Sequence, residues 1–318
     1  SSQANPEVMQ AMVQTGYGGV EVLQAATIAR PRPQPGEVLV QVRAAGLDRG
    51  TWHLMTGRPY LVRLVTGLAR PKQPVLGLDV AGTVVEVGAQ VTRFAPGDQV
   101  FGIGRGSFAE LAVAQQDKLA RKPSGLSFAQ AAVSGVSALT ALQSLEAGRL
   151  ARGERVLIIG ASGGVGTWAV QLARLLGAEV TAVCSASKME LVRALGATQV
   201  IDYTTTACTG SYELILDVAG NTPLARLRRL LTPTGRLVFV GGENGGDFTA
   251  GFGRQLKALL LAPFVKQRFI PFMTKQHSPD LERLARWLEA GAVRPVLDRE
   301  CPLRDLAQAM SDLEAGRV

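Results

Sequence analysis

The stretch GASGGVGTWAVQLARLLGA, residues Gly160–Ala178, decides the fold of this chain. It follows the apolar run RVLII (Arg155–Ile159) and leads into a helical pattern that we expect over residues 165–176. Glycine inside a regular element costs roughly 0.5–1 kcal/mol relative to alanine, so the cluster indicates a main chain that must stay uncovered. The spacing Ala161-x-Gly163-x-x-Gly166 fits the dinucleotide fingerprint, with alanine in place of the first glycine.

In that fingerprint a tight turn brings the bare main chain close to a pyrophosphate, and the following helix offers unpaired N–H groups and a partial positive charge. We therefore predict that the whole turn binds the phosphates of a dinucleotide, namely Ala161, Ser162, Gly163, Gly164, Val165 and Gly166. The alternative is a glycine-rich turn that packs tightly and holds no ligand.

The end of the second predicted strand indicates which dinucleotide is bound. An NAD site usually has Asp or Glu there to accept from the ribose hydroxyl, but VTAVCSASKMELVR (residues 180–193) has no acid between Cys184 and Lys188. Ser185 and Lys188 suit a 2′-phosphate, so we predict NADPH. Tyr203 could stack on or bond to the same phosphate. The alternatives are an ordinary solvated lysine and an ordinary exposed tyrosine.

Two textures divide the chain. From residue 10 to about residue 123, short alternating runs such as 36–46, 79–88 and 98–104 favour a compact, mostly-β domain, a partly closed barrel. From about residue 127, helical patterns alternate with buried strand runs, which favours a parallel, doubly wound sheet. In this second region we expect strands at 179–184, 199–202, 214–220 and 236–242 and helices at 187–195 and 222–231.

The last part of the chain contains an amphipathic helix at 280–291 and a strand-like piece at 293–298, which could rejoin the first domain. We therefore expect a first domain over residues 1–125, a dinucleotide-binding domain over 126–279, and a return to the first domain over 280–318.

Composition excludes several protein classes. The 318 residues are 47% hydrophobic and only 5% aromatic, as expected for an aliphatic globular core. The three cysteines are few, odd in number and far apart, which predicts neither a disulfide framework nor a zinc knuckle and favours a cytoplasmic location. We expect no transmembrane segment and no secretory signal. The net charge of +8 is spread along the chain, so we expect no obligatory nucleic acid.

Several stretches together resemble the medium-chain dehydrogenase/reductase superfamily, and within it the zinc-free quinone oxidoreductase, or zeta-crystallin-like, branch. They include AMVQTGYGG (11–19), the run from Pro74 to Gly102 that contains APGD, GSFAELAVA (106–114) and LGATQVIDY (195–203). The resemblance covers nearly the whole chain. It implies a Rossmann sheet beside a GroES-like barrel domain, with chemistry in the cleft between them.

The same resemblance addresses the metal. Zinc alcohol dehydrogenases of the superfamily carry Gly-His-Glu where this chain has Gly77, Leu78 and Asp79, and a zinc-binding cysteine near Asp48. No cysteine and histidine cluster has ligand spacing, so we expect no metal. What remains is hydride transfer from reduced nicotinamide to a small electron acceptor, a quinone or an α,β-unsaturated carbonyl.

Catalytic candidates follow from position. Asp48, where quinone reductases of this branch often have Asn, would donate a proton if burial raised its pKa, or it caps the helix that follows. His53 could protonate the acceptor, or it is a surface residue. Trp52 and Tyr60 could wall the acceptor pocket. The resemblance places Thr140 beside the nicotinamide carboxamide, although its hydroxyl could equally bond a backbone carbonyl.

The carboxyl edge of the sheet supplies the remaining cofactor candidates. Ligands bind at that edge in open α/β sheets, so we expect the ribose and nicotinamide to be lined by Ala219, Asn221, Gly241 and Gly242. Relatives continue past EAGRV (314–318), so no C-terminal cofactor contact is assigned.

Some alternatives stay open from the sequence. Residues 252–273 are basic and apolar and could form a lid, a dimer contact or a membrane patch, with Pro263 and Pro271 interrupting any long helix. We expect a homodimer. The competing functions are an enoyl-thioester reductase of the same fold and a non-catalytic, crystallin-like protein that binds NADPH or RNA.

Overall fold

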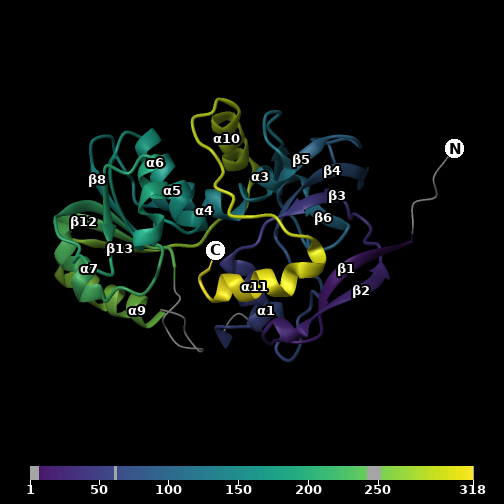
Figure 1. The fold of residues 1–318 in the computed structure, drawn as a ribbon, viewed down its shortest axis with the longest axis horizontal. Coiled ribbons are helices and arrows are strands. Elements are labelled where there is room, and N and C mark those ends of the chain that lie inside the picture. The colour runs from purple at the N-terminus through teal and green to yellow at the C-terminus, as the bar shows by residue number, and fades with distance from the viewer. Residues whose placement is uncertain (1–6, 61–62, 242–251, 318) are drawn as a thin grey trace. The chain divides into compact units, whose positions relative to one another are not determined.

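A computed structural model describes residues 7–60, 63–241 and 252–317 (Figure 1). The chain divides into two compact units. Unit 1 comprises residues 1–136 and 276–318, and unit 2 comprises residues 137–275. The predicted domain limits at residues 125 and 279 remain a prediction.

Unit 2 is built on a six-stranded parallel sheet in the order β10-β9-β8-β11-β12-β13. This is the doubly wound Rossmann order, in which the direction of winding changes between β8 and β11. The strands are β8 (Arg155–Ile159), β9 (Glu179–Cys184), β10 (Gln199–Asp202), β11 (Tyr212–Asp217), β12 (Leu231–Phe239) and β13 (Arg268–Pro271). The predicted parallel sheet is thus confirmed.

The helices of this unit are α4 (Val136–Ala147), α5 (Gly164–Leu175), α6 (Met189–Ala194), α7 (Leu224–Leu230) and α9 (Phe252–Leu261), with short 3-10 turns η4 (Ala186–Lys188) and η5 (Ala262–Phe264). Leu157, Ile215 and Leu237, from three neighbouring strands, lie in one buried apolar cluster. Leu227 of α7 and Ala258 of α9 pack into the same cluster, so these two helices are anchored on the sheet.

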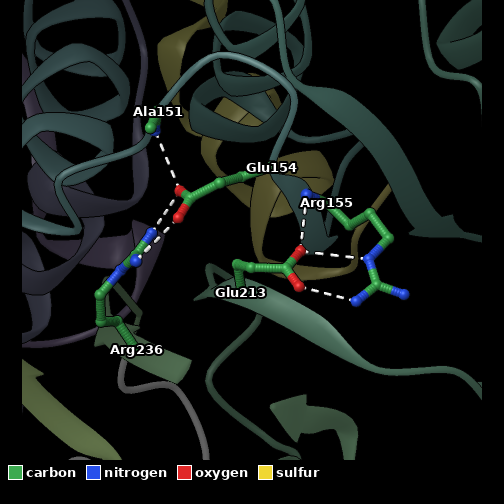
Figure 2. A network of polar contacts seen from close by, with 5 residues as sticks. All are labelled: Ala151, Glu154, Arg155, Glu213 and Arg236. Atoms are coloured by element: carbon green, nitrogen blue, oxygen red, sulfur yellow. Dashed lines mark hydrogen bonds and ion pairs between the residues drawn. The ribbon is translucent and has the colours of Figure 1, made fainter. Parts of the chain in front are cut away.

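Ion pairs join three adjacent strands near the amino edge of the sheet (Figure 2). Arg155, which begins β8, pairs with Glu213 of β11 at 2.7 Å, and this guanidinium lowers the pKa of the Glu213 carboxyl. Arg236 of β12 donates to Glu154 at 3.0 Å, and Glu154 also accepts from the Ala151 N–H at 2.9 Å. The network fixes the end of β8 opposite to Gly160, so it lies away from the predicted cofactor turn.

Unit 1 contains an antiparallel sheet in the order β6-β3-β4-β5-β7 and a separate antiparallel pair, β1–β2. The strands are β1 (Val8–Gln14), β2 (Leu23–Ala29), β3 (Glu37–Ala45), β4 (Asp79–Val87), β5 (Gln99–Ile103), β6 (Leu111–Gln115) and β7 (Leu119–Arg121). Val38 and Val40 are buried in one core cluster against which Val42 packs, as the alternation predicts. The mostly-β, GroES-like domain is confirmed.

Unit 1 also holds η1 (Val20–Val22), α1 (Arg49–Thr56), α2 (Arg63–Thr66), η3 (Gln116–Lys118), α3 (Phe128–Ala132), α10 (Ser278–Glu289), η6 (Leu303–Asp305) and α11 (Leu306–Glu314). The APGD turn is present: Gly97 has φ +97°, and the Asp98 carboxylate accepts from the Ala95 N–H at 2.9 Å. No helix within the described ranges is long and apolar enough to cross a membrane.

Some predicted elements differ from the structure. The strand-like piece at 293–298 is not a strand, and its Pro295 lacks the N–H that a sheet needs. The predicted helix 187–195 begins with η4, and only Met189–Ala194 is α-helical. Helix α7 begins at Leu224 because Pro223 occupies its N-cap. Strand β13 and helix α11 are among the elements that have no counterpart in the prediction.

Candidate functional site

The glycine turn between β8 and α5 packs closely against its own helix and against the loop that follows β11. Gly160 has φ +88°, and a Cβ there would lie 2.9 Å from the Ala219 nitrogen. A Cβ on Gly166 would collide with the Gly160 carbonyl oxygen. The N–H groups of Gly160 and Ala161 both donate to the Val183 oxygen, at 3.1 and 3.0 Å, which ties the turn to the end of β9. Glycine is therefore required here for packing.

The same turn leaves its main chain available to a ligand. Helix α5 starts after Gly163 without a side-chain cap, and the first N–H groups of any α-helix lack intrahelical partners. Gly163 and Gly164 are exposed, while Ser162 and Val165 are half-buried. A bare, uncapped helix start with exposed glycines fits a pyrophosphate.

The predicted 2′-phosphate residues come together at the ends of β9 and β10. Cys184 and Asp202 are paired in register, and the Tyr203 N–H donates to the Cys184 oxygen at 3.2 Å. Ser185 follows directly and its hydroxyl lies 3.3 Å from that of Ser187, while the Lys188 N–H donates to the Ser185 oxygen at 3.1 Å. Tyr203, which is exposed and directly follows β10, therefore has its main chain beside the end of β9, from which Ser185 and Lys188 continue.

One carboxylate near this site escaped the sequence analysis. Asp202 precedes Tyr203, but its oxygens accept from the Thr204 N–H at 3.0 Å, the Thr204 hydroxyl at 2.8 Å and the Thr205 hydroxyl at 3.1 Å. These bonds, the backbone one first, lower the pKa of Asp202. The carboxylate orders the turn that carries Tyr203.

The loop that leaves β11 is fixed by a buried ion pair. Asp217 is fully buried, and its carboxylate contacts Arg254 of α9 at 2.7 Å and accepts from the Gly220 N–H at 3.1 Å. Arg254 also donates to the Thr222 oxygen at 2.7 Å. Burial raises the pKa of Asp217, and the Arg254 guanidinium opposes this shift. The sequence analysis did not identify Arg254.

The predicted nicotinamide residues lie on or beside this loop. The Ala219 N–H donates to the Ile159 oxygen at 3.0 Å, and Asn221 is exposed. The Gly241 N–H donates to the main-chain carbonyl oxygen of Asp217 at 3.0 Å, and a Cβ on Gly241 would collide with the carbonyl oxygen of Val218. Gly242 lies outside the described residues.

Unit 1 carries the predicted catalytic carboxyl at the start of α1. Asp48 caps this helix: one oxygen accepts from the Thr51 N–H at 2.7 Å and from its hydroxyl at 2.9 Å. The other oxygen is buried and has no partner among the residues that the structure describes. Burial raises the pKa of Asp48 although the bonds from Thr51 oppose it. The cap and the raised pKa therefore occur together.

Two family descriptions match this chain: "Alcohol dehydrogenase GroES-like domain" over residues 34–124 and "Zinc-binding dehydrogenase" over residues 195–318. A "Quinone-oxidoreductase homolog, chloroplastic" from Spinacia oleracea is 32% identical over 98% of this chain and 97% of its own length. The "NAD(P)H oxidoreductase RTN4IP1, mitochondrial" from Mus musculus is 33% identical over 100% of this chain and 89% of its own.

The chain belongs to the medium-chain dehydrogenase/reductase superfamily, in its quinone oxidoreductase-like branch. It is an NAD(P)H-dependent oxidoreductase of that family. The fold agrees: a structure of the quinone oxidoreductase from Coxiella burnetii, 27% identical, covers 98% of this chain with a TM-score of 0.86, over 97% of its own chain.

The other catalytic candidates of this oxidoreductase have local partners. His53 lies half-buried on α1, and its Nδ1 is 2.8 Å from the Arg58 oxygen. The Trp52 ring meets the His53 ring edge-on at 5.1 Å. Tyr60 is exposed, with the Arg63 guanidinium over its ring. Thr140 belongs to unit 2, where its hydroxyl lies 2.8 Å from that of Thr274. The catalytic roles of Asp48, His53, Tyr60 and Thr140 remain predictions.

A cavity of about 250 Å³ lies within unit 1 of the oxidoreductase, beside α1. Its apolar lining includes Leu54 of α1, Leu76 and Leu78, and its polar lining includes Gln14 and Arg105. Gly77 and Leu78, two of the three positions that match the Gly-His-Glu of zinc relatives, thus face a cavity. A second cavity of about 320 Å³ adjoins β1 and β2 and is lined by none of the predicted site residues.

Proposed function

We propose that this oxidoreductase transfers hydride from NADPH to a compact quinone or α,β-unsaturated carbonyl, without zinc. The observation that carries the choice of NADPH is the grouping of Ser185, Lys188 and Tyr203 at the ends of β9 and β10. Hydroxyls and a cation favour a 2′-phosphate. The acid that directly precedes Tyr203, Asp202, is bonded to its own turn.

Each residue of the site has a role in this proposal. The turn from Ala161 to Gly166 binds the pyrophosphate through main-chain N–H groups. Ala219, Asn221 and Gly241 line the ribose and nicotinamide, and the Thr140 hydroxyl holds the carboxamide. NADPH supplies the hydride when bound. Trp52 and Tyr60 bind the acceptor, and Asp48 and His53 deliver its proton.

The acceptor binds in the cavity lined by Leu54, Leu76 and Leu78. A cavity of about 150 Å³ holds benzene. The cavity of about 250 Å³ therefore has room for a quinone of one or two rings or for a short enone. Trp52, Tyr60 and Asp48 do not line this cavity, so their contact with the acceptor is a separate part of the proposal. Once hydride has reached the acceptor, its oxygen takes a proton from the Asp48 carboxyl, which burial keeps protonated to a higher pH than usual. His53 reprotonates Asp48 from solvent.

The absence of zinc chemistry is part of the proposal. Leu78 stands where zinc relatives carry histidine, and within the described ranges no three His, Cys, Asp or Glu side chains are grouped so as to bind a metal ion. Prolonged treatment with a strong chelator should leave the turnover rate unchanged. A stoichiometric metal whose removal abolishes turnover would contradict this part. The cytoplasmic location and the homodimer remain predictions.

The cofactor test compares two nucleotides and one variant. Wild-type protein should bind NADPH more tightly than NADH, as measured by nicotinamide fluorescence. Lys188→Ala should weaken NADPH by about tenfold or more, as expected for a charged hydrogen bond, and leave NADH within about twofold. Arg193→Ala, an exposed cation on α6, is the matched control. Equal losses for both nucleotides in Lys188→Ala would show that Lys188 does not touch the extra phosphate.

The acceptor test is a screen of NADPH oxidation against benzoquinones, naphthoquinones, short enones and enoyl thioesters. The compact quinones and enones should be reduced, and Leu54→Trp, which fills the cavity, should raise their KM without changing the Kd for NADPH. Turnover of enoyl thioesters alone would favour the competing reductase. Binding of NADPH without reduction of any acceptor would favour a non-catalytic protein.

A further inference from the structure

The cavity beside α1 has a buried amide on its wall that is only partly bonded. Gln14, the last residue of β1, lines this cavity and is only 5% exposed. Its Oε1 atom is buried and has no hydrogen-bond partner among the residues that the structure describes. A buried acceptor without a partner is costly and rare in folded proteins. Such an atom in a residue that lines a cavity indicates a ligand that donates a hydrogen bond to it.

Two main-chain carbonyl groups hold Gln14 in place. Its backbone N–H donates to the Pro74 carbonyl oxygen at 2.7 Å, and its side-chain Nε2 donates to the Gln73 carbonyl oxygen at 3.2 Å. Because a carbonyl oxygen only accepts, the amide cannot be turned over without losing the bond to Gln73. Val13, which precedes Gln14, is bridged to Val75 on the same segment. The amide oxygen is therefore the atom of this side chain that is free to bind a ligand, and its position is fixed.

The charged groups on the cavity wall have one sign. Among the described residues that line it, the charged side chains are Lys72 and Arg105. Lys72 donates to the Val65 carbonyl oxygen at 3.2 Å and Arg105 to the Glu37 carboxylate at 3.4 Å, and each cation has further N–H groups. These groups can donate to the carbonyl oxygens of a quinone or an enone, but they cannot accept from a hydroxyl. Gln14 supplies the buried acceptor that a hydroxyl needs.

We propose that the acceptor carries a hydroxyl or N–H group beside its reducible carbonyl system, and that Gln14 selects this group. The inference rests on the proposed function, which places the acceptor in this cavity. An acceptor with an apolar substituent leaves Oε1 unpaired, whereas a hydroxyl bonds to it. A site that bonds a substrate hydroxyl discriminates against the analogue without it more strongly than an apolar pocket discriminates against a missing methylene. Gln14 is thus a specificity-determining residue that does not touch the reacting atoms.

The test compares two quinones that differ in one substituent. The side chains of 2-(hydroxymethyl)-1,4-naphthoquinone and 2-ethyl-1,4-naphthoquinone have the same number of heavy atoms, and only the first has a donor. With saturating NADPH, wild-type protein should show a kcat/KM at least about fivefold higher for the hydroxymethyl compound. In a cavity without a partner for the hydroxyl, the ethyl compound would be the better substrate, because burying an unpaired hydroxyl costs free energy. Equal values or a preference for the ethyl compound would overturn the inference.

A pair of variants assigns the preference to Gln14. Gln14→Met removes the amide and keeps an unbranched side chain. It should raise the KM of the hydroxymethyl compound by about fivefold and leave its kcat, the KM of the ethyl compound and the Kd for NADPH within about twofold.

Gln10→Met is the matched control for this variant. It makes the same substitution on β1 and also removes an Nε2 bond, here to the Thr27 hydroxyl at 2.8 Å, but Gln10 is exposed and lines neither cavity. It should keep the wild-type preference. A preference that survives in Gln14→Met would overturn the inference. Circular dichroism establishes that both variants fold, and if Gln14→Met does not, the comparison of the two quinones in wild type still decides.

A binding measurement separates failure of this inference from failure of the proposed function. The compounds 2-naphthalenemethanol and 2-ethylnaphthalene carry the same two substituents without a carbonyl to reduce, and their fluorescence reports binding. If wild type reduces no quinone or enone but prefers 2-naphthalenemethanol, and Gln14→Met loses this preference, the proposed reaction fails and the selection of a donor by Gln14 stands. If both quinones are reduced alike by wild type and by Gln14→Met, the reaction stands and the inference fails. Neither reduction nor binding would overturn both.

Discussion

Asp79 is a carboxyl placed in the interior of unit 1. Asp79 is only 3% exposed, and one of its carboxylate oxygens accepts from the Val136 N–H at 2.7 Å. Gly46 lies against Asp79, since a Cβ on this glycine would be 2.8 Å from the Asp79 Cβ. Burial raises the pKa of Asp79 well above the usual value, and the Asp48 carboxylate, when it is ionised, raises it further. The folded protein therefore keeps a proton that the unfolded chain loses near pH 4.

This sets the sign of a pH effect on stability. Because the folded state binds the extra proton, the wild-type free energy of unfolding falls as pH rises from about 4 toward the raised pKa, at most by about 1.4 kcal/mol per pH unit. Asp79→Asn keeps the acceptor for Val136 and removes the titration. Urea unfolding between about pH 4.5 and 8 should show the variant increasingly more stable than wild type. A difference that stays constant with pH would show that Asp79 is ionised in the folded protein.

Sequence alone locates residues whose partners are close along the chain. The glycine spacing and the Ser185, Lys188 and Tyr203 group follow from local pattern, and main-chain hydrogen bonds join the segments that carry the group. Their role in binding a cofactor remains a prediction. Asp79 was noted only as a match to the glutamate of zinc relatives, and Arg254 was not noted at all, because their partners lie 57 and 37 residues away. For a buried ion pair between residues so far apart, such as Asp217 and Arg254, the only signal in the sequence is a charged residue at the end of an apolar run.

At the scale of elements, the loop after β11 joins the phosphate turn to α9. Val218 and Ala219 both donate to the Ile159 oxygen at 3.0 Å, next to Gly160. From the other side, Arg254 holds Asp217 and Thr222, which flank the loop. Helix α9 thereby positions the loop on which Ala219 and Asn221 lie, and the position of that loop should affect only the nicotinamide half of the cofactor.

The effect of Arg254 on the nicotinamide half of the cofactor can be measured separately from its effect on the other half. Arg254→Ala should raise the Kd for NADPH by about tenfold, the loss expected for a charged hydrogen bond, while the Kd for 2′,5′-ADP, which lacks the nicotinamide half, stays within about twofold. Arg254→Lys retains the charge and should recover part of the NADPH affinity. Calorimetric titration measures both ligands. Equal weakening of both would indicate a general loss of structure and no selective effect on the loop.

The elements that sequence analysis found are those with a strong period or clear boundaries. The central strands β8, β9 and β11 are mostly apolar and mostly buried, as expected for strands covered on both faces. Strand β13 is only four residues long and two of them are Arg268 and Pro271, so it gives little periodic signal and its pairing with β12 defines it. The piece at 293–298 alternates like a strand but is interrupted by Pro295.

At the scale of the whole molecule, net charge affects how fast an anionic cofactor arrives. The chain carries +8 with 34 basic and 26 acidic residues. A protein field of this sign accelerates the association of a polyanion, and salt screens it over a Debye length of about 30 Å at 0.01 M and about 10 Å at 0.1 M. The short contacts that we propose between Lys188 and the 2′-phosphate would be screened much less than this field.

The association rate constant for NADPH should therefore fall by about threefold or more between 0.01 M and 0.3 M salt, while the dissociation rate constant changes less. Stopped-flow nicotinamide fluorescence measures both. NADH carries one phosphate fewer and should show a shallower salt dependence, because steering scales with ligand charge. The opposite result would be a salt-dependent loss of NADPH affinity that appears entirely in the dissociation rate constant. It would show that short-range ion pairs at the site, and not the net charge of the molecule, cause the salt effect.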